Sequence, residues 1–91
     1  MDLFTLDLML PDRKLYKGPA TQILVPGEEG DLEILTHHMS IIAKLRQGKI
    51  RVSVHNEPEL VFEIEGGYLE MVDNHCVILA SGQQNLAPSG S

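Results

Sequence analysis

Hydrophobic and polar residues alternate with a period of two over most of this 91-residue chain. The alternation is clearest around residues 3–10, 50–55 and 60–65. Because a β-strand sends successive side chains to opposite faces, each stretch predicts a strand with one apolar and one mostly polar face. Residues 77–80 differ, since Val-Ile-Leu-Ala is a continuous apolar run. Such a run is typical of a strand that is buried on both faces.

Short turn sequences separate these stretches. Glycine, proline, asparagine and aspartate gather in seven places, which are Pro11-Asp12, Lys17-Gly18-Pro19, Pro26-Gly27, Gln47-Gly48, Asn56-Glu57-Pro58, Gly66-Gly67 and Asp73-Asn74. These residues favour turns because they adopt or fix the backbone angles that turns require. The pattern predicts strands at residues 2–10, 13–17, 20–25, 32–36, 41–45, 48–55, 59–66, 67–72 and 75–81. Strands spaced in this way indicate an all-β sandwich or barrel.

Residues 37–46 are the best candidate for a helix. Met39, Ile42 and Leu45 would share one helical face. The segment is short, lacks a good N-cap and ends at Gln47-Gly48, so a strand is the preferred prediction. Residues 82–91 are rich in glycine, serine, glutamine and proline and show no apolar period. We therefore expect one domain at residues 1–81, followed by a polar tail or linker remnant.

The composition excludes several classes of protein. Thirteen acidic against seven basic residues, with a net charge of −6, argue against a nucleic-acid-binding protein. The single cysteine cannot form an internal disulfide, and no stretch approaches the ~20 apolar residues of a membrane span. The N-terminus has neither the positive start nor the apolar run of a signal peptide. We expect an intracellular, soluble domain.

No group of residues forms a recognisable catalytic or metal-binding motif. On a strand, His37 and His38 point to opposite faces and cannot chelate one ion together. Cys76 lies beside an apolar run, which favours a small buried hydrophobe over a nucleophile. The sequence Gly27-Glu28-Glu29-Gly30 is followed by Asp31 and not by the Lys-Ser/Thr pair of a phosphate-binding loop. We expect no catalytic residue, no cofactor and no metal.

Charged residues are segregated along the chain. Four acidic residues lie within residues 28–33, and four of the seven basic residues lie within residues 44–51. The acidic segment is either a solvated, flexible turn or a docking loop for a basic or polar partner surface. A surface polarised in this way suits a protein that docks in one orientation. The residues alone therefore indicate a small acidic β-domain that binds a partner and does not catalyse a reaction.

A series of motifs runs in order through residues 2–81. After an opening Leu-x-Leu strand come Leu15-Tyr16-Lys17-Gly18, the sequence ILVPGEEGDL at 23–32, His38, LRQGKIR at 45–51, EGGYLEMV at 65–72 and VILA at 77–80. In this order and spacing the chain resembles the N-terminal β-sandwich domain of the epsilon subunit of F-type ATP synthases, which is called delta in mitochondria. The resemblance implies a ten-stranded β-sandwich of two sheets.

The resemblance also implies a function and two contact surfaces. It implies a non-catalytic rotor subunit of the central stalk, which links the gamma subunit to the membrane ring of c subunits and couples ion-driven rotation to ATP synthesis. The subunit would lie at the inner face of an energy-coupling membrane, on the cytoplasmic side of a bacterial plasma membrane, and touch the membrane only through the ring. By family position the ring-facing residues are Glu29, Gly30, Asp31 and His38, and the gamma-facing residues are Leu10, Ile42 and Ala43.

The chain departs from the family pattern in two places. The family usually continues from the acidic loop as G-x-L-P-G-H-A-P-L, whereas residues 33–41 read EILTHHMSI and lack both prolines and two of the glycines. Most members also carry a C-terminal pair of helices that inhibits ATP hydrolysis and in some cases binds ATP. This chain has only a polar stretch after Ser81, so we predict a sandwich without the helical hairpin, no inhibitory arm and no nucleotide site in this chain.

Two other functions compete with this interpretation. One is a free-standing β-sandwich interaction or carrier module, although lipoyl and biotinyl carriers need a lysine in a Met/Ala-Lys-Met-like sequence at a hairpin tip. None of the four lysines has that setting, and they are Lys14, Lys17, Lys44 and Lys49. The other is a small enzyme, which would need polar groups that converge in a pocket.

Overall fold

The computed structural model describes residues 2–37 and 39–82, and this part of the chain folds into nine strands. They are β1 (Phe4–Leu10), β2 (Arg13–Ala20), β3 (Gln22–Gly27), β4 (Gly30–Leu35), β5 (Ile41–Leu45), β6 (Gly48–Ser53), β7 (Leu60–Ile64), β8 (Gly66–Val72) and β9 (His75–Ser81). Within those residues there is no helix, and hence none able to cross a membrane. The nine strands correspond one by one to the nine predicted from the period-two pattern.

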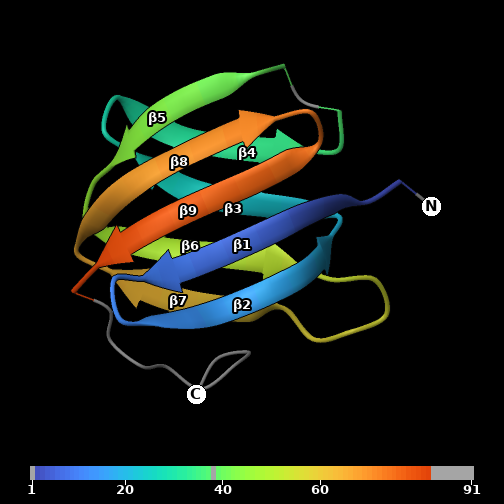
Figure 1. Ribbon diagram of the computed structural model, residues 1–91, viewed down its shortest axis with the longest axis horizontal. Coiled ribbons are helices and arrows are strands. Elements are labelled where there is room, and N and C mark those ends of the chain that lie inside the picture. Colours follow the sequence, from blue (N-terminus) through green and yellow to red (C-terminus); the bar gives the residue numbers. More distant parts are fainter. Residues whose placement is uncertain (1, 38, 83–91) are drawn as a thin grey trace.

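The strands form two layers that are joined through hydrogen bonds. Their order is β2-β1-β9-β8-β5-β3-β6-β7, with β4 paired to the other edge of β3. Figure 1 shows β2, β1, β9, β8 and β5 in front and β4, β3, β6 and β7 behind. Strands β1 and β9 run parallel, and the other paired strands run antiparallel. The predicted all-β sandwich is confirmed, with nine strands in the described residues where the family pattern implies ten.

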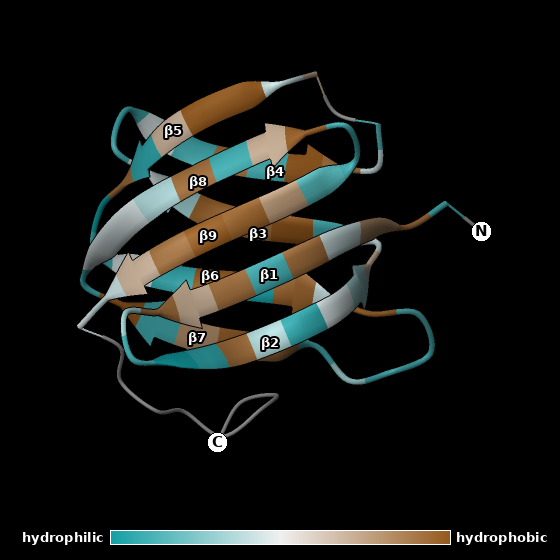
Figure 2. Ribbon diagram, in the orientation of Figure 1, coloured by the Kyte–Doolittle hydropathy of each residue, from teal (hydrophilic) through white to brown (hydrophobic). Residues whose placement is uncertain are grey.

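The core lies between the two layers and follows from the alternation in the sequence. All nine strands contribute buried apolar side chains, β2 only through Ala20 at its end, and the bands of Figure 2 show the alternation along the ribbons. The core consists of Phe4, Leu6, Leu8, Ala20, Ile23, Val25, Ile34, Leu45, Ile50, Val52, Ile64, Leu69, Met71, Cys76, Ile78 and Ala80. Burial stabilises a fold by about 1.5–3 kcal/mol for each large apolar side chain, which explains how so small a domain closes around one core.

The strand that was preferred over a helix at residues 41–45 is confirmed, because these residues pair along their whole length with β8. One detail of the sequence interpretation is wrong. Strand β9 is not buried on both faces, since Cys76, Ile78 and Ala80 point inward while Leu79 is 46% exposed. The reason is that β9 lies in the front layer, whose outer face is not covered by another strand (Figure 1).

Positive backbone angles occur at three of the predicted turns, at Asn56, Gly67 and Asp73-Asn74. Asp73 and Asn74 have φ of 51° and 62°, as a two-residue hairpin turn with two left-handed residues requires. The Asn74 side chain then ties three segments together, because Nδ2 donates to Leu3 O at 2.8 Å and Oδ1 accepts from His37 N–H at 2.7 Å. Gly67 has φ of 154°, and a Cβ there would lie 2.5 Å from Leu79 O. Only glycine therefore fits the backbone at Gly67.

The last described strand ends where the predicted domain ends, and the division into domain and tail stays a prediction. Strand β9 ends at Ser81, the last residue of the predicted domain. The predicted polar tail at residues 82–91 falls outside the described residues except for Gly82. That part of the prediction therefore stays a prediction.

Candidate functional site

One side of the sandwich holds an open groove between the layers. Strand β5 forms the upper edge of the front layer in Figure 1, and β4 forms the upper edge of the layer behind it. The groove has a volume of about 450 Å³ and is lined by residues 27–32 and 41–44. It therefore brings together Glu29, Gly30 and Asp31, which family position assigns to the ring, with Ile42 and Ala43, which it assigns to gamma.

The acidic wall of the groove is the hairpin turn between β3 and β4. Gly27 and Gly30 are paired in register and enclose the two-residue turn Glu28-Glu29. Gly30 has φ of 141°, and a Cβ on Gly27 would lie 2.4 Å from Gly30 O. Only glycine fits at these two positions, so the turn closes tightly and both glutamates are exposed. The Gly27–Gly30 segment, which the sequence already distinguished from a phosphate-binding loop, is a tight hairpin that presents carboxylates.

Backbone and side-chain contacts fasten this turn to the front layer. Glu28 N–H donates to Lys44 O at 2.8 Å, and Arg46 N–H donates to Pro26 O at 2.9 Å. Lys44 Nζ lies 3.6 Å from Glu28 Oε2, and Arg46 Nη2 lies 2.5 Å from Asp31 Oδ1. Exposed ion pairs such as these contribute about 0–1 kcal/mol each, so they orient the turn more than they stabilise the fold.

These pairs leave one acid of the turn without a cation. Within residues 2–37 and 39–82, Glu29 makes no ion pair, while its neighbours Glu28 and Asp31 each have one. The acidic residues within 28–33 and the basic residues within 44–51 thus partly form ion pairs with each other. The charge that remains free for a partner is concentrated at the tip of the turn, on Glu29.

The residues predicted to face gamma do not share one surface. Ile42 is 76% exposed on the outer face of β5, whereas Ala43 points inward at the level of buried Leu69 and lines the groove. Leu10, at the end of β1, is partly buried and packs against the core. Adjacent positions on a strand point to opposite faces, so Ile42 and Ala43 cannot contact a flat partner surface together.

The ring-facing residues stay a prediction, and the structure shows only where three of the four lie. His38 lies outside the described residues, and Glu29, Gly30 and Asp31 lie together at the turn. His37 lies at the opposite end of β4 from Gly30. At about 3.3 Å per residue, the length of β4 separates the two ends by roughly 20 Å. The acidic turn and His37 therefore lie at different ends of the sandwich.

The sequence interpretation missed an apolar surface on the outer face of the front layer. Tyr68 is 58% exposed and Leu79 is 46% exposed, and the two are paired across β8 and β9. Their row continues to Lys44 on β5 and to the partly buried Met9 on β1. The alternation in residues 75–81 could have revealed this surface. The prediction that residues 77–80 are buried on both faces concealed it.

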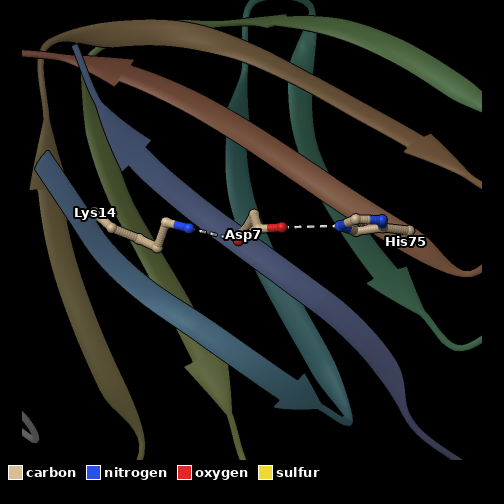
Figure 3. Close-up of polar contacts among 3 residues, drawn as sticks. All are labelled: Asp7, Lys14 and His75. Carbon is tan, nitrogen blue, oxygen red and sulfur yellow. Dashed lines mark hydrogen bonds and ion pairs between the residues drawn. The ribbon is translucent and has the colours of Figure 1, made fainter.

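A buried carboxylate lies elsewhere on the same outer face. Asp7 is only 8% exposed, and Figure 3 shows its side chain between His75 and Lys14. Asp7 Oδ2 lies 2.9 Å from His75 Nε2, and Oδ1 lies 3.8 Å from Lys14 Nζ. The hydrogen bond from His75 lowers the pKa of Asp7, and the charges of Lys17 and Lys14 act in the same direction, while desolvation acts against them. This contact joins β1, β2 and β9.

The described residues contain no cluster of metal-binding side chains, and their one cysteine lies in the core. No group of three or more His, Cys, Asp or Glu side chains in residues 2–37 and 39–82 is arranged to hold a metal ion. Cys76 is fully buried, and burial raises the pKa of its thiol to about 12. A thiol in that state is a core side chain and not a nucleophile, as its place in the sequence indicated.

Comparisons with known proteins point to one family. The family model described as ATP synthase, Delta/Epsilon chain, beta-sandwich domain matches residues 3–84. The chain is 35% identical over 80 residues to ATP synthase epsilon chain 2 of Ralstonia nicotianae, an alignment that covers 88% of this chain and 58% of that protein. It is 34% identical over 76 residues to the ATP synthase epsilon chain of Chlorobium limicola, covering 84% of this chain and 86% of that one. The chain thus spans little more than half of the first relative and most of the second.

Two solved structures share the fold. One is the mitochondrial ATP synthase of Euglena gracilis, described as OSCP/F1/c-ring in rotational state 1, with a TM-score of 0.85 at 21% identity over 92% of this chain and 54% of the matched chain. The other is the central stalk/c-ring of the Tetrahymena thermophila mitochondrial ATP synthase, with a TM-score of 0.74 at 20% identity over 89% of this chain and 65% of the matched chain. At these identities the likeness shows the fold of the domain.

Proposed function

The chain belongs to the delta/epsilon family of ATP synthase subunits, and on this premise we propose that it is a rotor subunit of the central stalk of an F-type ATP synthase. It is a non-catalytic subunit of that complex. It links the gamma subunit to the ring of c subunits, so that ion-driven rotation of the ring is coupled to ATP synthesis. Its place is at the inner face of an energy-coupling membrane, on the cytoplasmic side in a bacterium, with membrane contact only through the ring.

The single observation that carries this proposal is the groove on the open side of the sandwich. It presents an acidic turn and an exposed apolar edge next to each other, as a docking surface for a partner protein does. Glu29, Gly30 and Asp31 serve the ring contact, with His38 as a further ring-facing residue by family position. Ile42 and Ala43 serve the gamma contact, and the outer face around Tyr68 and Leu79 extends it. Leu10 stays a gamma-facing candidate on family position alone.

The descriptions of the two solved structures support this placement. One names OSCP, F1 and the c-ring, and the other names the central stalk and c-ring. The carrier alternative lacks comparable support, because the two-residue turns Pro11-Asp12, Glu28-Glu29 and Asp73-Asn74 carry no lysine. We propose that the chain itself binds neither nucleotide nor nucleic acid.

Binding to isolated gamma subunit of the same complex tests the gamma contact. We expect the two proteins to form a one-to-one complex at micromolar concentration in size-exclusion chromatography and calorimetry. Ile42→Asp places a charge in the contact and should weaken binding at least tenfold, which is about 1.4 kcal/mol. The matched control is Glu57→Asp, in the loop between β6 and β7 at the other end of the sandwich. Two proteins that elute separately at micromolar concentration would overturn the proposal.

A second experiment tests the ring contact. Purified c-ring in detergent should retain the chain together with gamma, and Glu29→Lys should weaken that retention without changing the affinity for gamma alone. The reason is that Glu29 lies at the tip of the turn without a cation of its own. Glu63→Lys, on β7 in the other layer, is the control for a simple change in net charge. Equal losses for both variants would remove the acidic turn from the ring contact.

A further inference from the structure

We propose that the groove receives an extended segment of the gamma subunit, which adds to the free edge of β5 as a further β-strand. This inference rests on the proposed function, which names the partner but not its mode of binding. It assigns the recognition to backbone hydrogen bonds on an open strand edge, together with side-chain contacts in the groove.

The pairing of β5 shows which backbone groups are open. Ile41, Ala43 and Leu45 face Met71, Leu69 and Gly67 in the ladder with β8. The other edge of β5 meets β3 only near its end, where Lys44 O accepts from Glu28 and Arg46 N–H donates to Pro26. Because N–H and C=O groups alternate between the two edges of a strand, those of Ile42 point to the same free edge as Lys44 O.

The opposite wall of the groove is a second open edge. Within residues 2–37 and 39–82, strand β4 pairs only with β3, and the tight turn makes Gly27 and Gly30 a hydrogen-bonded pair. The same alternation then directs the backbone groups of Asp31 and Glu33 away from β3. Between the two edges lie the partly buried apolar side chains of Leu32, Ile41 and Ala43. An entering strand would find free backbone groups and an apolar floor.

Strand β5 also lacks the features that normally protect a free edge. Exposed edge strands are usually guarded by charged residues, proline or bulges. The edge strand β2 carries Lys14, Lys17 and Pro19, and its pairing with β1 contains a register shift. Strand β5 presents Ile42, 76% exposed, and its one lysine is paired with Glu28. An unguarded apolar edge of this kind is typical of a strand that is covered in the assembled complex.

The groove also defines the chemistry of the entering segment. Its lining contains three acids, Glu28, Glu29 and Asp31, and one base, Lys44. An incoming strand that alternates apolar residues with lysine or arginine would match both the floor and this charge. The free stretch of β5 is short, because β3 already takes its end at Lys44 and Arg46. The added strand is therefore expected to pair over about three to five residues, as at a short edge.

A proline substitution separates backbone recognition from side-chain recognition. Ile42→Pro removes an N–H that faces the groove and leaves the N–H groups that pair with β8, so an edge position of this kind tolerates it. Ile42→Ala is the matched control, since it shortens the same side chain and keeps the N–H. We expect Ile42→Pro to bind gamma about tenfold more weakly than Ile42→Ala, as for the loss of one interfacial backbone hydrogen bond and the distortion around it.

Hydrogen exchange on the unsubstituted chain keeps the test decisive if the proline variant fails to fold. On binding gamma, the amide of Ile42 should exchange at least tenfold more slowly, because it becomes hydrogen-bonded to the added strand. The amide of Glu57, at the other end of the sandwich, is the internal reference. Gamma binding without protection of Ile42 would overturn strand addition and leave the proposed function standing. A chain that does not bind gamma at all would overturn the proposed function itself.

Discussion

The sandwich has two sides at which the edge strands of its two layers face each other, and these two sides are built differently. On one side, β2 and β7 lie one in front of the other at the bottom of Figure 1. Leu15 and Tyr16 from β2 and Leu60 and Phe62 from β7 pack against the core there. On the other side, β4 and β5 flank the groove of about 450 Å³ with its acidic turn.

The difference separates stability from recognition. Large side chains close the first side and remove apolar surface from water, which is the main favourable contribution to folding. The second side closes only at one end, where Gly27 pairs with Leu45, and keeps backbone edges and an apolar floor exposed. Substitutions on the closed side should therefore change the free energy of unfolding, and substitutions on the open side should change binding.

The largest effect is expected from one substitution made on both sides. Ile64, on edge strand β7, is 1% exposed, and Ile42, on edge strand β5, is 76% exposed. Ile64→Ala should lower the free energy of unfolding by about 3 kcal/mol, because it removes buried methyl groups and leaves a cavity. Ile42→Ala should change it by less than about 0.5 kcal/mol, as is usual for surface positions. Urea denaturation measures both changes in the free energy of unfolding. Equal losses for the two variants would contradict the difference between the two sides.

A smaller loss in the free energy of unfolding is expected at the point where the front layer turns toward the back layer. Gly67, paired with Leu45, has a left-handed φ and no room for a Cβ beside Leu79 O. Gly67→Ala should lower the free energy of unfolding by about 1–3 kcal/mol, the usual cost of a strained backbone. Gly66→Ala is the control, because its Cβ would make an ordinary contact of 3.5 Å. Thermal unfolding of the two variants gives the comparison, and similar midpoints would show that the backbone yields at Gly67.

A pH-dependent loss of stability is expected from the carboxylate on the outer face near β2. The folded structure lowers the pKa of Asp7, first through the hydrogen bond from His75. A carboxyl group whose pKa is lower in the folded state stabilises the fold above its unfolded pKa of about 3.9, and that contribution is lost as the pH falls through the folded value. Asp7→Asn should flatten the fall in unfolding temperature between about pH 5 and pH 2. An Asp7→Asn profile that matches the profile of the unsubstituted chain would contradict the assignment.

The smallest effect is expected from the ion pair at the rim of the groove. Asp31 and Arg46 have side chains that are 79% and 47% exposed. A double-mutant cycle with Asp31→Asn and Arg46→Gln should give a coupling of about 0.5 kcal/mol, which declines at high salt. A coupling of several kcal/mol would mean that the open side is held together by this pair and is not free to receive a partner.

The strands were predictable because the period of two is a local property of the chain. Nine segments were placed correctly without knowledge of their partners, but the boundaries moved where pairing overrode a turn signal. The Lys17-Gly18-Pro19 sequence looked like a turn, yet β2 continues to Ala20 because Thr5 pairs with Pro19 and Phe4 with Ala20. Proline is tolerated there since β2 is an edge strand.

The candidate site was predictable only as separate pieces. The acidic turn followed from a cluster of charges, and Ile42 and Ala43 followed from the resemblance to the family. The groove that joins them depends on contacts between β3 and β5, which lie far enough apart in the sequence that no local pattern encodes their approach. The exposure of Leu79 was missed for a similar reason, since burial on one face or two depends on whether a second layer covers the strand.

The sequence by itself determined that this is a small acidic β-domain, where its turns fall and which alternate side chains are apolar. These properties follow from backbone sterics and the period of a strand, which act over a few residues. Only the tertiary structure decided which layer each strand enters, which edge stays unpaired and which charges meet across the groove. Those outcomes depend on pairings between distant segments, and it is such pairings that place the acidic turn beside the free edge of β5.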